Sequence, residues 1–342
     1  MLNNISVIKS RLKPTVQTMA VIKDNAYGHG FDGVAHCLAP EVDWFCVARA
    51  IEGVRLRDIG IKLPILVFEL PNKQSAGLYT KHQLTATISD LESVDLLETG
   101  TKYHINLDTG MRRLGVLPDQ VSLLIEKMNS RTDVTATGIY THFAKADDPG
   151  NVEVKTQLEL FNQLRKSFDS KLMTHSANTG AIFHYSDLDL QFDGVRPGVS
   201  LFGYGAGEYV IEELKPVIEW KTFLMQVKTV KKGEAVSYGG RWLAPKNGYL
   251  GVIPVGYGSG IPRLLSGQIE FSILGKSYPQ VGTISMDYSM VFLGDDKLKT
   301  GSDVFILNTT ELNAMTWAQK ANTIPYEITT GINPLIQREF IG

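Results

Sequence analysis

The first two hundred residues of the chain alternate between short apolar runs and stretches with a helical spacing of apolar residues. Each run has the length of one strand, and most are rich in β-branched or aromatic residues. The eight runs cover residues 19–23, 44–48, 64–68, 85–89, 103–107, 138–143, 172–177 and 192–198. Because strands that alternate with helices pair in parallel, this half predicts an α/β fold of eight βα units. Eight such units in about 200 residues suit a closed (β/α)8 barrel of the TIM type.

The stretches between the runs predict helices. The clearest amphipathic helix covers residues 152–168, and others are expected over 1–10, over 94–100 ending at Gly100, and over 120–128. An open doubly wound sheet is the alternative architecture, but it would carry a glycine fingerprint after the first strand, and none follows residue 23.

The pattern changes after about residue 214, where helical spacing almost disappears. Strand-like segments separated by Gly, Asp and Lys turns then cover residues 217–230, 249–258, 268–275, 289–294 and 301–307. One late helix is expected over residues 311–322. The sequence therefore predicts a second, mostly antiparallel β domain, with the division at 1–210 and 211–342.

Composition and charge exclude several classes of partner. The 34 basic and 36 acidic side chains give a net charge of -2, so neither the charge nor its distribution predicts nucleic-acid binding. No apolar run reaches the ~18 residues of a membrane span, and the first residues lack the apolar core of a signal peptide. The only two cysteines, Cys37 and Cys46, form no CxxC motif, which is typical of a reducing cytoplasm.

Polar residues follow the predicted barrel strands where a barrel of this type carries its chemistry. Those residues are Lys23, Arg49, Asp90, Asp108 with Arg113, His142, His175 with Asn178, and Arg196. A mouth lined by a lysine, arginines and histidines suits an anionic ligand.

Three chemistries compete for this mouth. A metal-dependent hydrolase using His142 and His175 lacks an HxH or HExxH motif and a carboxylate at ligand spacing. A phosphosugar enzyme would use the arginines but has no specific motif. The third is a lysine that forms an imine, since a lysine amine near other cations is a nucleophile toward carbonyls. Pyridoxal phosphate offers such a carbonyl and a phosphate.

The segment around Lys23, AVIKDNAYGHG, resembles the cofactor-lysine motif of the alanine racemase family. Further stretches match that family in order over essentially the whole chain: DTGMRRLG, THFA, HSANTG, VRPGVSLFGYG, VSYGG and VGTISMD. Tyr326, in TIPYEI, adds a weaker match.

The resemblance implies an isomerase that interconverts L-alanine and D-alanine, supplying D-alanine for peptidoglycan. Lys23 would hold pyridoxal 5'-phosphate as an aldimine and then act as one base, and Tyr238 would be the opposite base. The family forms a head-to-tail homodimer, so Tyr238 would reach the barrel of the partner. A racemase of broader or different specificity, for serine or basic amino acids, stays open.

The resemblance also implies the cofactor contacts. Arg196 would face the pyridine nitrogen and leave it unprotonated, because the pKa of arginine lies above ~12. His142 would stack on the ring, and His175 would support Arg196. The phosphate contacts would be Tyr27, Asn178, Thr179, Gly198, Val199 and Tyr326. A related decarboxylase would carry an acidic residue at position 196, and a cofactor-homeostasis protein would lack the second domain.

For the substrate, the family pattern M-x-R-x-G selects Arg113 rather than Arg112 to bind the carboxylate. Met286 and Asp287 of the partner would line the pocket, and Tyr257 would narrow its entrance. Three features of the sequence depart from the family pattern. Asn106 replaces a carbamylated lysine that braces the arginine, and a bound anion is our hypothesis for its substitute. Ser259 replaces an acidic residue, and a helix is expected where relatives begin with a strand.

Overall fold

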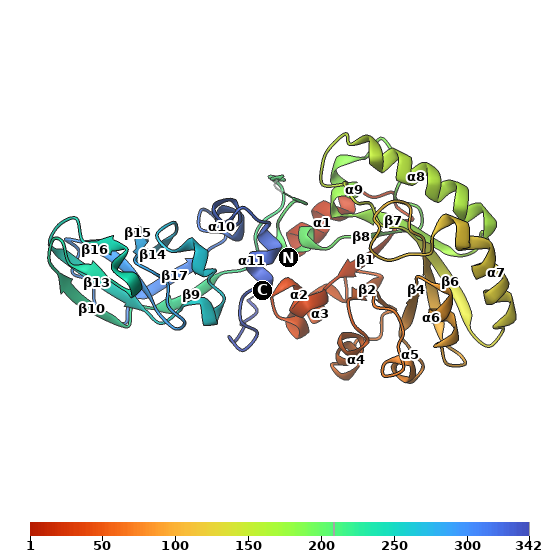
Figure 1. Cartoon of the computed structure of the whole chain (residues 1–342), viewed down its shortest axis with the longest axis horizontal. Helices are drawn as coiled ribbons and strands as arrows, with labels where there is room; N and C mark the ends of the chain where they lie inside the picture. Colours follow the sequence, from red (N-terminus) through yellow and green to blue (C-terminus); the bar gives the residue numbers. More distant parts are fainter. Residues whose placement is uncertain (208, 342) are drawn as a thin grey trace. The chain divides into compact units, whose positions relative to one another are not determined.

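The computed structural model describes residues 1–207 and 209–341. The chain divides into two compact units. The first comprises Met1–Ala26 with Gly30–Leu214, and the second comprises Tyr27–His29 with Lys215–Gly342. The second unit therefore includes three residues from the beginning of the chain. Each unit contains β-sheet of its own (Figure 1).

The first unit is built on a closed barrel in which the strands follow one another in chain order, β1 to β8. Every neighbouring pair is parallel, and β1 pairs with β8 to close the ring. The strands are β1 Gln17–Val21, β2 Trp44–Val47, β3 Ile65–Val67, β4 Thr85–Ile88, β5 Lys102–Asn106, β6 Thr135–Tyr140, β7 Met173–Asn178 and β8 Gly194–Arg196. The prediction of an eight-stranded barrel is confirmed.

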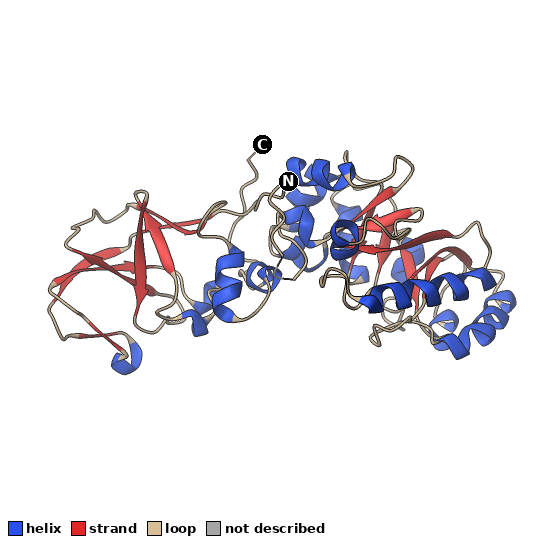
Figure 2. Cartoon of the chain, turned by 90° about the horizontal axis from the view of Figure 1, so that it is seen from above, coloured by secondary structure: helices blue, strands red, loops and turns tan. Residues whose placement is uncertain are grey.

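Helices surround these strands, as Figure 2 shows for the helices in blue and the strands in red. They are α1 Leu2–Ser10, α3 Phe31–Leu38, α4 Ala50–Asp58, α5 Ala76–Lys81, α6 Leu91–Asp95, α7 Val121–Ser130, α8 Val152–Leu164 and α9 Thr179–His184. The expected helix over 94–100 is wrong in its position. The Asp90 carboxylate accepts a hydrogen bond from the Ser93 amide at 2.7 Å, which starts α6 earlier, and the helix ends at Asp95.

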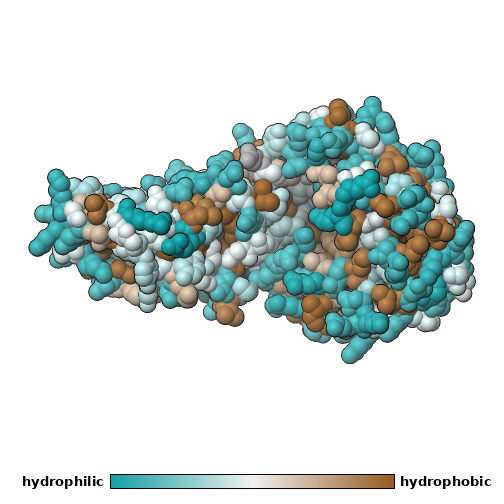
Figure 3. Space-filling model, viewed as in Figure 1, coloured by the Kyte–Doolittle hydropathy of each residue, from teal (hydrophilic) through white to brown (hydrophobic). Residues whose placement is uncertain are grey.

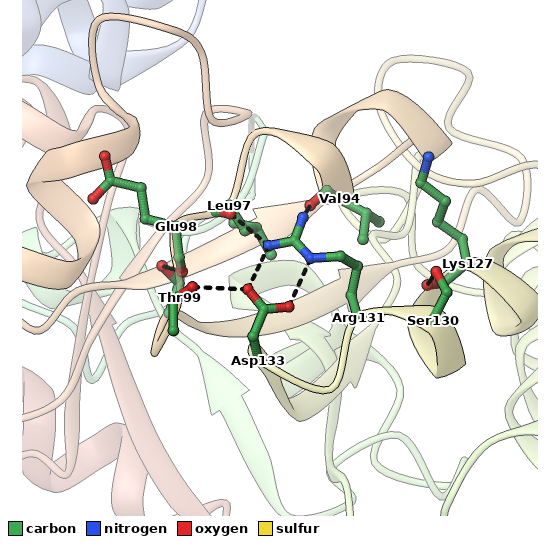
Figure 4. Close-up of polar contacts among 9 residues, drawn as sticks. Val94, Leu97, Glu98, Thr99, Lys127, Ser130, Arg131 and Asp133 are labelled. Atoms are coloured by element: carbon green, nitrogen blue, oxygen red, sulfur yellow. Dashed lines mark hydrogen bonds and ion pairs between the residues drawn. The ribbon is translucent and has the colours of Figure 1, made fainter.

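One ion pair fixes the connection between α7 and β6 (Figure 4). Arg131 binds both carboxylate oxygens of Asp133, at 2.7 and 2.9 Å, and also donates to the carbonyl groups of Val94 and Leu97. Thr99 donates to the same carboxylate at 3.0 Å. The guanidinium and this hydroxyl hold the pKa of Asp133 well below its usual range. The paired groups tie the loop after α6 to the loop after α7.

The second unit contains a seven-stranded antiparallel sheet in the order β10-β13-β16-β15-β14-β17-β9. Its strands are β9 Trp220–Phe223, β10 Gln226–Val230, β13 Gly248–Ile253, β14 Glu270–Ile273, β15 Lys276–Val281, β16 Ser289–Gly294 and β17 Asp303–Leu307. A two-stranded sheet pairs β11 Ala235–Val236 with β12 Trp242–Leu243. The predicted antiparallel β domain is confirmed.

Two helices of the second unit follow its last strand. α10 covers Ala314–Ala321, inside the expected range, and Asn313 caps it by accepting from the amides of Met315 and Thr316. α11, Pro325–Thr330, was not expected from the sequence. It has a proline at its start, where the missing N–H is not needed, and it is too short to show a helical period.

The loop that carries Arg113 depends on Gly115, because the space around this residue is too small for a side chain. Gly115 has φ +130°, and a Cβ there would lie 2.5 Å from the backbone nitrogen of Asp108. Gly100 also has positive φ, +88°, but open space surrounds it. Gly100→Ala should therefore lose only about 1 kcal/mol of stability from backbone strain.

Gly115→Ala should lose about 2–3 kcal/mol or more, because the clash adds to the strain. Chemical denaturation of the two variants beside the parent protein measures this difference. Equal losses in both variants would show that the loop can move away from Asp108.

Candidate functional site

Lys23 begins a backbone turn of the left-handed kind. β1 ends at Val21, and Lys23 is the first residue of the short helical element α2, Lys23–Tyr27. The next four residues have φ between 52° and 55°, the region that side chains disfavour. Each such residue costs about 1–2 kcal/mol relative to a right-handed conformation. Strain of this kind is concentrated at functional sites, where surrounding contacts maintain it.

Contacts within the first unit hold this turn. Glu52 accepts from the Asp24 amide at 2.7 Å, and it also accepts from the amides of Ala48 and Arg49. The Asn25 side chain accepts from the Phe31 amide at 3.0 Å. These bonds connect the turn to the start of α4 and α3, so the position of Lys23 at the carboxyl end of β1 is fixed.

Arg196, the last residue of β8, is a buried cation held by neutral acceptors. Its side chain donates to the carbonyl groups of Thr141 and Ser176, at 2.7 and 3.0 Å, and lies 2.5 Å from His175 Nδ1. Only 3% of Arg196 is exposed. Within residues 1–207 and 209–341, no carboxylate forms an ion pair with it. Burial lowers the pKa of the guanidinium. The guanidinium still has only N–H groups, so it is the donor in each of these hydrogen bonds.

Two histidines beside Arg196 are neutral. Burial first, and then the Arg196 charge, hold the pKa of His175 and of His142 well below the ordinary value. Arg113 and Lys23 also lower the pKa of His142, so these cations lie around that one imidazole. The structure thus brings together the predicted residues Lys23, Arg113, His142, His175 and Arg196.

Tyr140 belongs to the same cluster and was not selected from the sequence. Its ring stacks on His175, with centroids 4.8 Å apart and planes at 13°, and the Arg196 guanidinium lies 5.0 Å from its centroid. Burial raises the pKa of Tyr140 to about 12. Its phenol therefore stays neutral and lies 3.2 Å from the Thr87 hydroxyl.

Arg113 lies on an exposed loop that Asp108 shapes. The Asp108 carboxylate accepts from the amides of Gly110 and Arg112, at 2.8 and 3.1 Å. Arg112 has φ 55°, so the chain turns sharply just before Arg113. Asn106 is buried and donates to the Ser89 hydroxyl at 3.2 Å.

The ends of β7 and β8 hold four of the residues expected to bind phosphate. Asn178 caps α9 by accepting from the Ala181 amide at 3.0 Å. The Thr179 hydroxyl accepts from the Gly198 amide at 3.1 Å and lies 3.0 Å from the Ser200 hydroxyl. Val199 begins the turn η3, Val199–Phe202. This corner therefore presents hydroxyl and amide groups next to one another.

The second unit holds Tyr27 and Tyr326. Their rings lie edge to face with centroids 6.3 Å apart. Gly28 packs so closely on α11 that a Cβ would lie 1.8 Å from the Thr329 carbonyl oxygen. Arg338 donates to the Gly28 carbonyl group at 2.8 Å.

Tyr238 lies in another part of the second unit, on the turn η4, Tyr238–Gly240. Its side chain is 72% exposed, which is unusual for a tyrosine in a rigid turn. Thr283 fixes the backbone on both sides: its hydroxyl donates to the Tyr238 carbonyl at 2.8 Å, and its own carbonyl accepts from Ser237 at 2.5 Å.

Met286, Asp287 and Tyr257 are exposed on two adjoining loops. The Tyr257 amide donates to the Ser285 carbonyl at 3.0 Å, and the Gly258 amide donates to the Met286 carbonyl at 2.9 Å. These backbone bonds hold the Tyr257 loop against the Met286 loop.

Comparison with known proteins gives matches over both units. The family described as alanine racemase, N-terminal domain, matches residues 1–206, and alanine racemase, C-terminal domain, matches residues 217–340. The alanine racemase of Chlorobaculum tepidum is 35% identical, covering 98% of this chain and 92% of that protein. The alanine racemase of Halothermothrix orenii is 33% identical, covering 98% and 93%.

Solved structures give the same result. Alanine racemase from Clostridium difficile 630 has a TM-score of 0.92 at 30% identity, covering 98% of this chain and 92% of that one. Histidine racemase from Leuconostoc mesenteroides has a TM-score of 0.91 at 27% identity, covering 100% and 95%. The fold and these matches define a pyridoxal-phosphate-dependent amino-acid racemase class. The chain belongs to the alanine racemase family.

Two features are absent from the described residues. No helix among them is long and apolar enough to cross a membrane. No group of three or more His, Cys, Asp or Glu side chains in the described part of the chain could hold a metal ion.

Acid should destabilise the first unit through its buried histidines. The pKa of His104 is lowered to about 3, mainly by burial, and those of His142 and His175 also lie well below normal. Below about pH 6.5 these histidines are protonated in the unfolded chain but stay neutral in the folded protein. Stability is therefore full above that pH and is lost as pH falls, by about 1.4 kcal/mol per pH unit for each histidine.

Denaturation in urea at about pH 7 and about pH 5 measures this loss. His175→Asn keeps an acceptor near Arg196 but removes one titrating group, so its stability should depend less on pH. An unchanged dependence would contradict the assignment of His175 as a neutral buried group.

Proposed function

We propose that this protein is an alanine racemase that interconverts L-alanine and D-alanine. The observation that carries the proposal is Arg196, a buried guanidinium at the barrel mouth that has no carboxylate partner among the described residues. Arg196, Arg113 and Lys23 all lower the pKa of the same imidazole, His142. We further propose that residues 1–210 carry the cofactor lysine and residues 211–342 the second base. D-alanine for peptidoglycan is the proposed product, made in the cytoplasm, a location consistent with the two free cysteines.

The donor set fits pyridoxal phosphate, the cofactor of this family. Lys23 would supply the amine for its aldehyde, Arg196 would face the ring nitrogen, and His142 would cover one face of the ring. The phosphate would be held by hydroxyl and amide groups of Tyr27, Asn178, Thr179, Gly198, Val199 and Tyr326. When bound, the cofactor supplies an electron-withdrawing ring that acidifies the α-proton of the amino acid.

Arg196 sets how strongly that ring can act. Since the guanidinium keeps its proton and His175 is neutral, neither group gives a proton to the ring nitrogen. Negative charge that develops at the α-carbon then stays close to it. This arrangement favours return of a proton to the same carbon over loss of carbon dioxide or transfer of the amino group.

Two bases would act on opposite faces of the α-carbon. The Lys23 amine would accept or return the proton on one face, and the Tyr238 phenol would do so on the other. Arg113 would hold the substrate carboxylate with its planar fork. Removal by one base and delivery by the other inverts the configuration.

The exposed phenol of Tyr238 supports a homodimer with shared sites. Leu243, Met286 and Tyr288 of the second unit are exposed as well, at 58%, 54% and 44%. Figure 3 shows hydrophobic residues in several small groups among hydrophilic ones on the visible face. A second copy is the proposed cover for this part of the second unit, with Tyr238, Met286 and Asp287 reaching its barrel mouth.

Mixing two inactive variants tests the shared site. Lys23→Ala and Tyr238→Phe should each abolish or cripple racemisation as pure proteins. After dissociation and reassociation together, each mixed dimer has one site with both native bases, so about a quarter of the parent activity should return. Chiral chromatography of the reaction products measures that recovery.

The Lys23→Ala protein also serves as the cofactor control, since it should not be fixed to pyridoxal phosphate by borohydride. Tyr238→Phe should still be fixed. No recovery on mixing, with subunit exchange verified, would show that Tyr238 does not act across a subunit boundary.

Substrate identity is the second test. A methyl side chain should fit best in a pocket narrowed by Tyr257 and Met286, so alanine should give the highest kcat/KM in a panel with serine, lysine and histidine. Histidine belongs in the panel because of the structural similarity to a histidine racemase. Ser259 and Asn106 depart from the family pattern, and preference for another amino acid would replace alanine as the proposed substrate.

A further inference from the structure

His104 lies in the interior of the barrel, away from the groups assigned above to cofactor and substrate. It comes from the middle of β5 and is fully buried. Its ring lies 5.4 Å from the ring of Trp44 on β2 and 5.1 Å from that of His175 on β7. Because β2, β5 and β7 are not neighbours in the ring of strands, these side chains meet only across its interior.

The hydrogen bonds define where each proton resides. Arg196 can only donate, so His175 Nδ1 must accept at 2.5 Å. A neutral imidazole that accepts at Nδ1 carries its proton on Nε2. That Nε2 lies 2.9 Å from His104 Nδ1, which is therefore the acceptor. The chain of donors runs from Arg196 through His175 to His104.

The chain of hydrogen bonds ends at His104, because His104 does not donate a hydrogen bond to any described residue. Its Nε2 must carry the remaining proton, and among the described residues that atom has no hydrogen-bond partner. A buried N–H without a partner is destabilising, so a benefit elsewhere should explain why the residue is a histidine.

Gly138 on β6 makes the space for this imidazole. A Cβ at position 138 would lie 2.6 to 2.7 Å from three atoms of the His104 ring. The backbone of Gly138 is therefore packed directly against His104, and any larger residue would displace the ring.

We propose that His104 is a positioning residue: it accepts the Nε2 proton of His175, locks that imidazole with Nδ1 toward Arg196, and so orients the guanidinium. Its link to catalysis rests on the proposed function, in which Arg196 faces the ring nitrogen. The tautomer of His175 is a property of the chain itself. The two parts are therefore tested separately.

The first experiment is NMR on the protein without cofactor, with ¹⁵N-labelled histidine. His175 should show a protonated Nε2 and a bare Nδ1, with a scalar coupling from that Nε2 to His104 Nδ1 across the hydrogen bond. His175→Asn and His104→Asn assign the signals. A proton on His175 Nδ1, or no coupling in the parent protein, would overturn the proposal without any variant that must fold.

The second experiment compares two replacements of His104. His104→Asn places an oxygen near the position of Nδ1 and keeps an acceptor, whereas His104→Leu removes it. In His104→Leu the Nε2 proton of His175 has no acceptor, so it should exchange faster, and pyridoxal phosphate should bind about ten-fold more weakly. His104→Asn should stay within about two-fold of the parent.

Two further variants separate positioning from general damage to the barrel. Ile105→Val shortens the next buried side chain, which points to the other face of β5, and should leave the His175 signals unchanged. Gly138→Ala keeps His104 but displaces it, and should reproduce the His104→Leu spectrum. Unchanged exchange of the His175 Nε2 proton and normal cofactor affinity in His104→Leu would refute the proposal.

The outcomes also distinguish the two proposals. Failure of the parent protein to bind pyridoxal phosphate would refute the proposed function, while the His175 tautomer and coupling would still test the role of His104.

Discussion

The first unit depends on a buried guanidinium, that of Arg196, which forms no ion pair with any carboxylate in the described part of the chain. A charge removed from water needs hydrogen bonds, and among the described residues Arg196 finds them in the Thr141 carbonyl just after β6 and in the Ser176 carbonyl and neutral His175 of β7. The acceptors on β7 are correctly placed because β7 pairs directly with β8, the strand that carries Arg196. The barrel therefore orients the cation, and burial together with the cation holds the pKa of the neighbouring imidazoles well below the ordinary value.

Backbone conformations that side chains disfavour surround the same mouth. The turn after Lys23 is left-handed over four residues, and Arg112 has a positive φ just before Arg113. Carboxylate and amide side chains hold these turns by accepting backbone N–H groups, as Glu52 and Asp108 do. Local strain is thus compensated by hydrogen bonds to rigid elements, which fixes side chains that would otherwise move.

Much of the fold follows from the sequence because periodicity reports burial directly. The eight predicted runs correspond to the eight barrel strands, since parallel strands buried on both faces are enriched in apolar residues. Short elements were less predictable. β15, Lys276–Val281, contains a lysine and a proline and gives no apolar run, and α6 was displaced by the cap at Asp90.

Only part of the candidate site could be predicted from the sequence, for a different reason. Residues at strand ends could be selected because polar groups contrast with the apolar run before them. Tyr140 and His104 lie inside such runs, where an aromatic or imidazole ring is consistent with ordinary packing. Only the three-dimensional meeting of β5, β6 and β7 shows that these rings contact His175.

Tyr27–His29 belong to the second unit, and this affects the order in which parts of the chain can fold during synthesis. The Gly28 carbonyl group is bound by Arg338, 310 positions further along the chain, and α11 packs on the same glycine. A barrel emerging from the ribosome would therefore have completed all eight strands while the segment that follows Lys23 still lacked its contacts with α11 and Arg338. Final ordering of this segment therefore waits until α11 and Arg338 have been synthesised, long after the barrel strands.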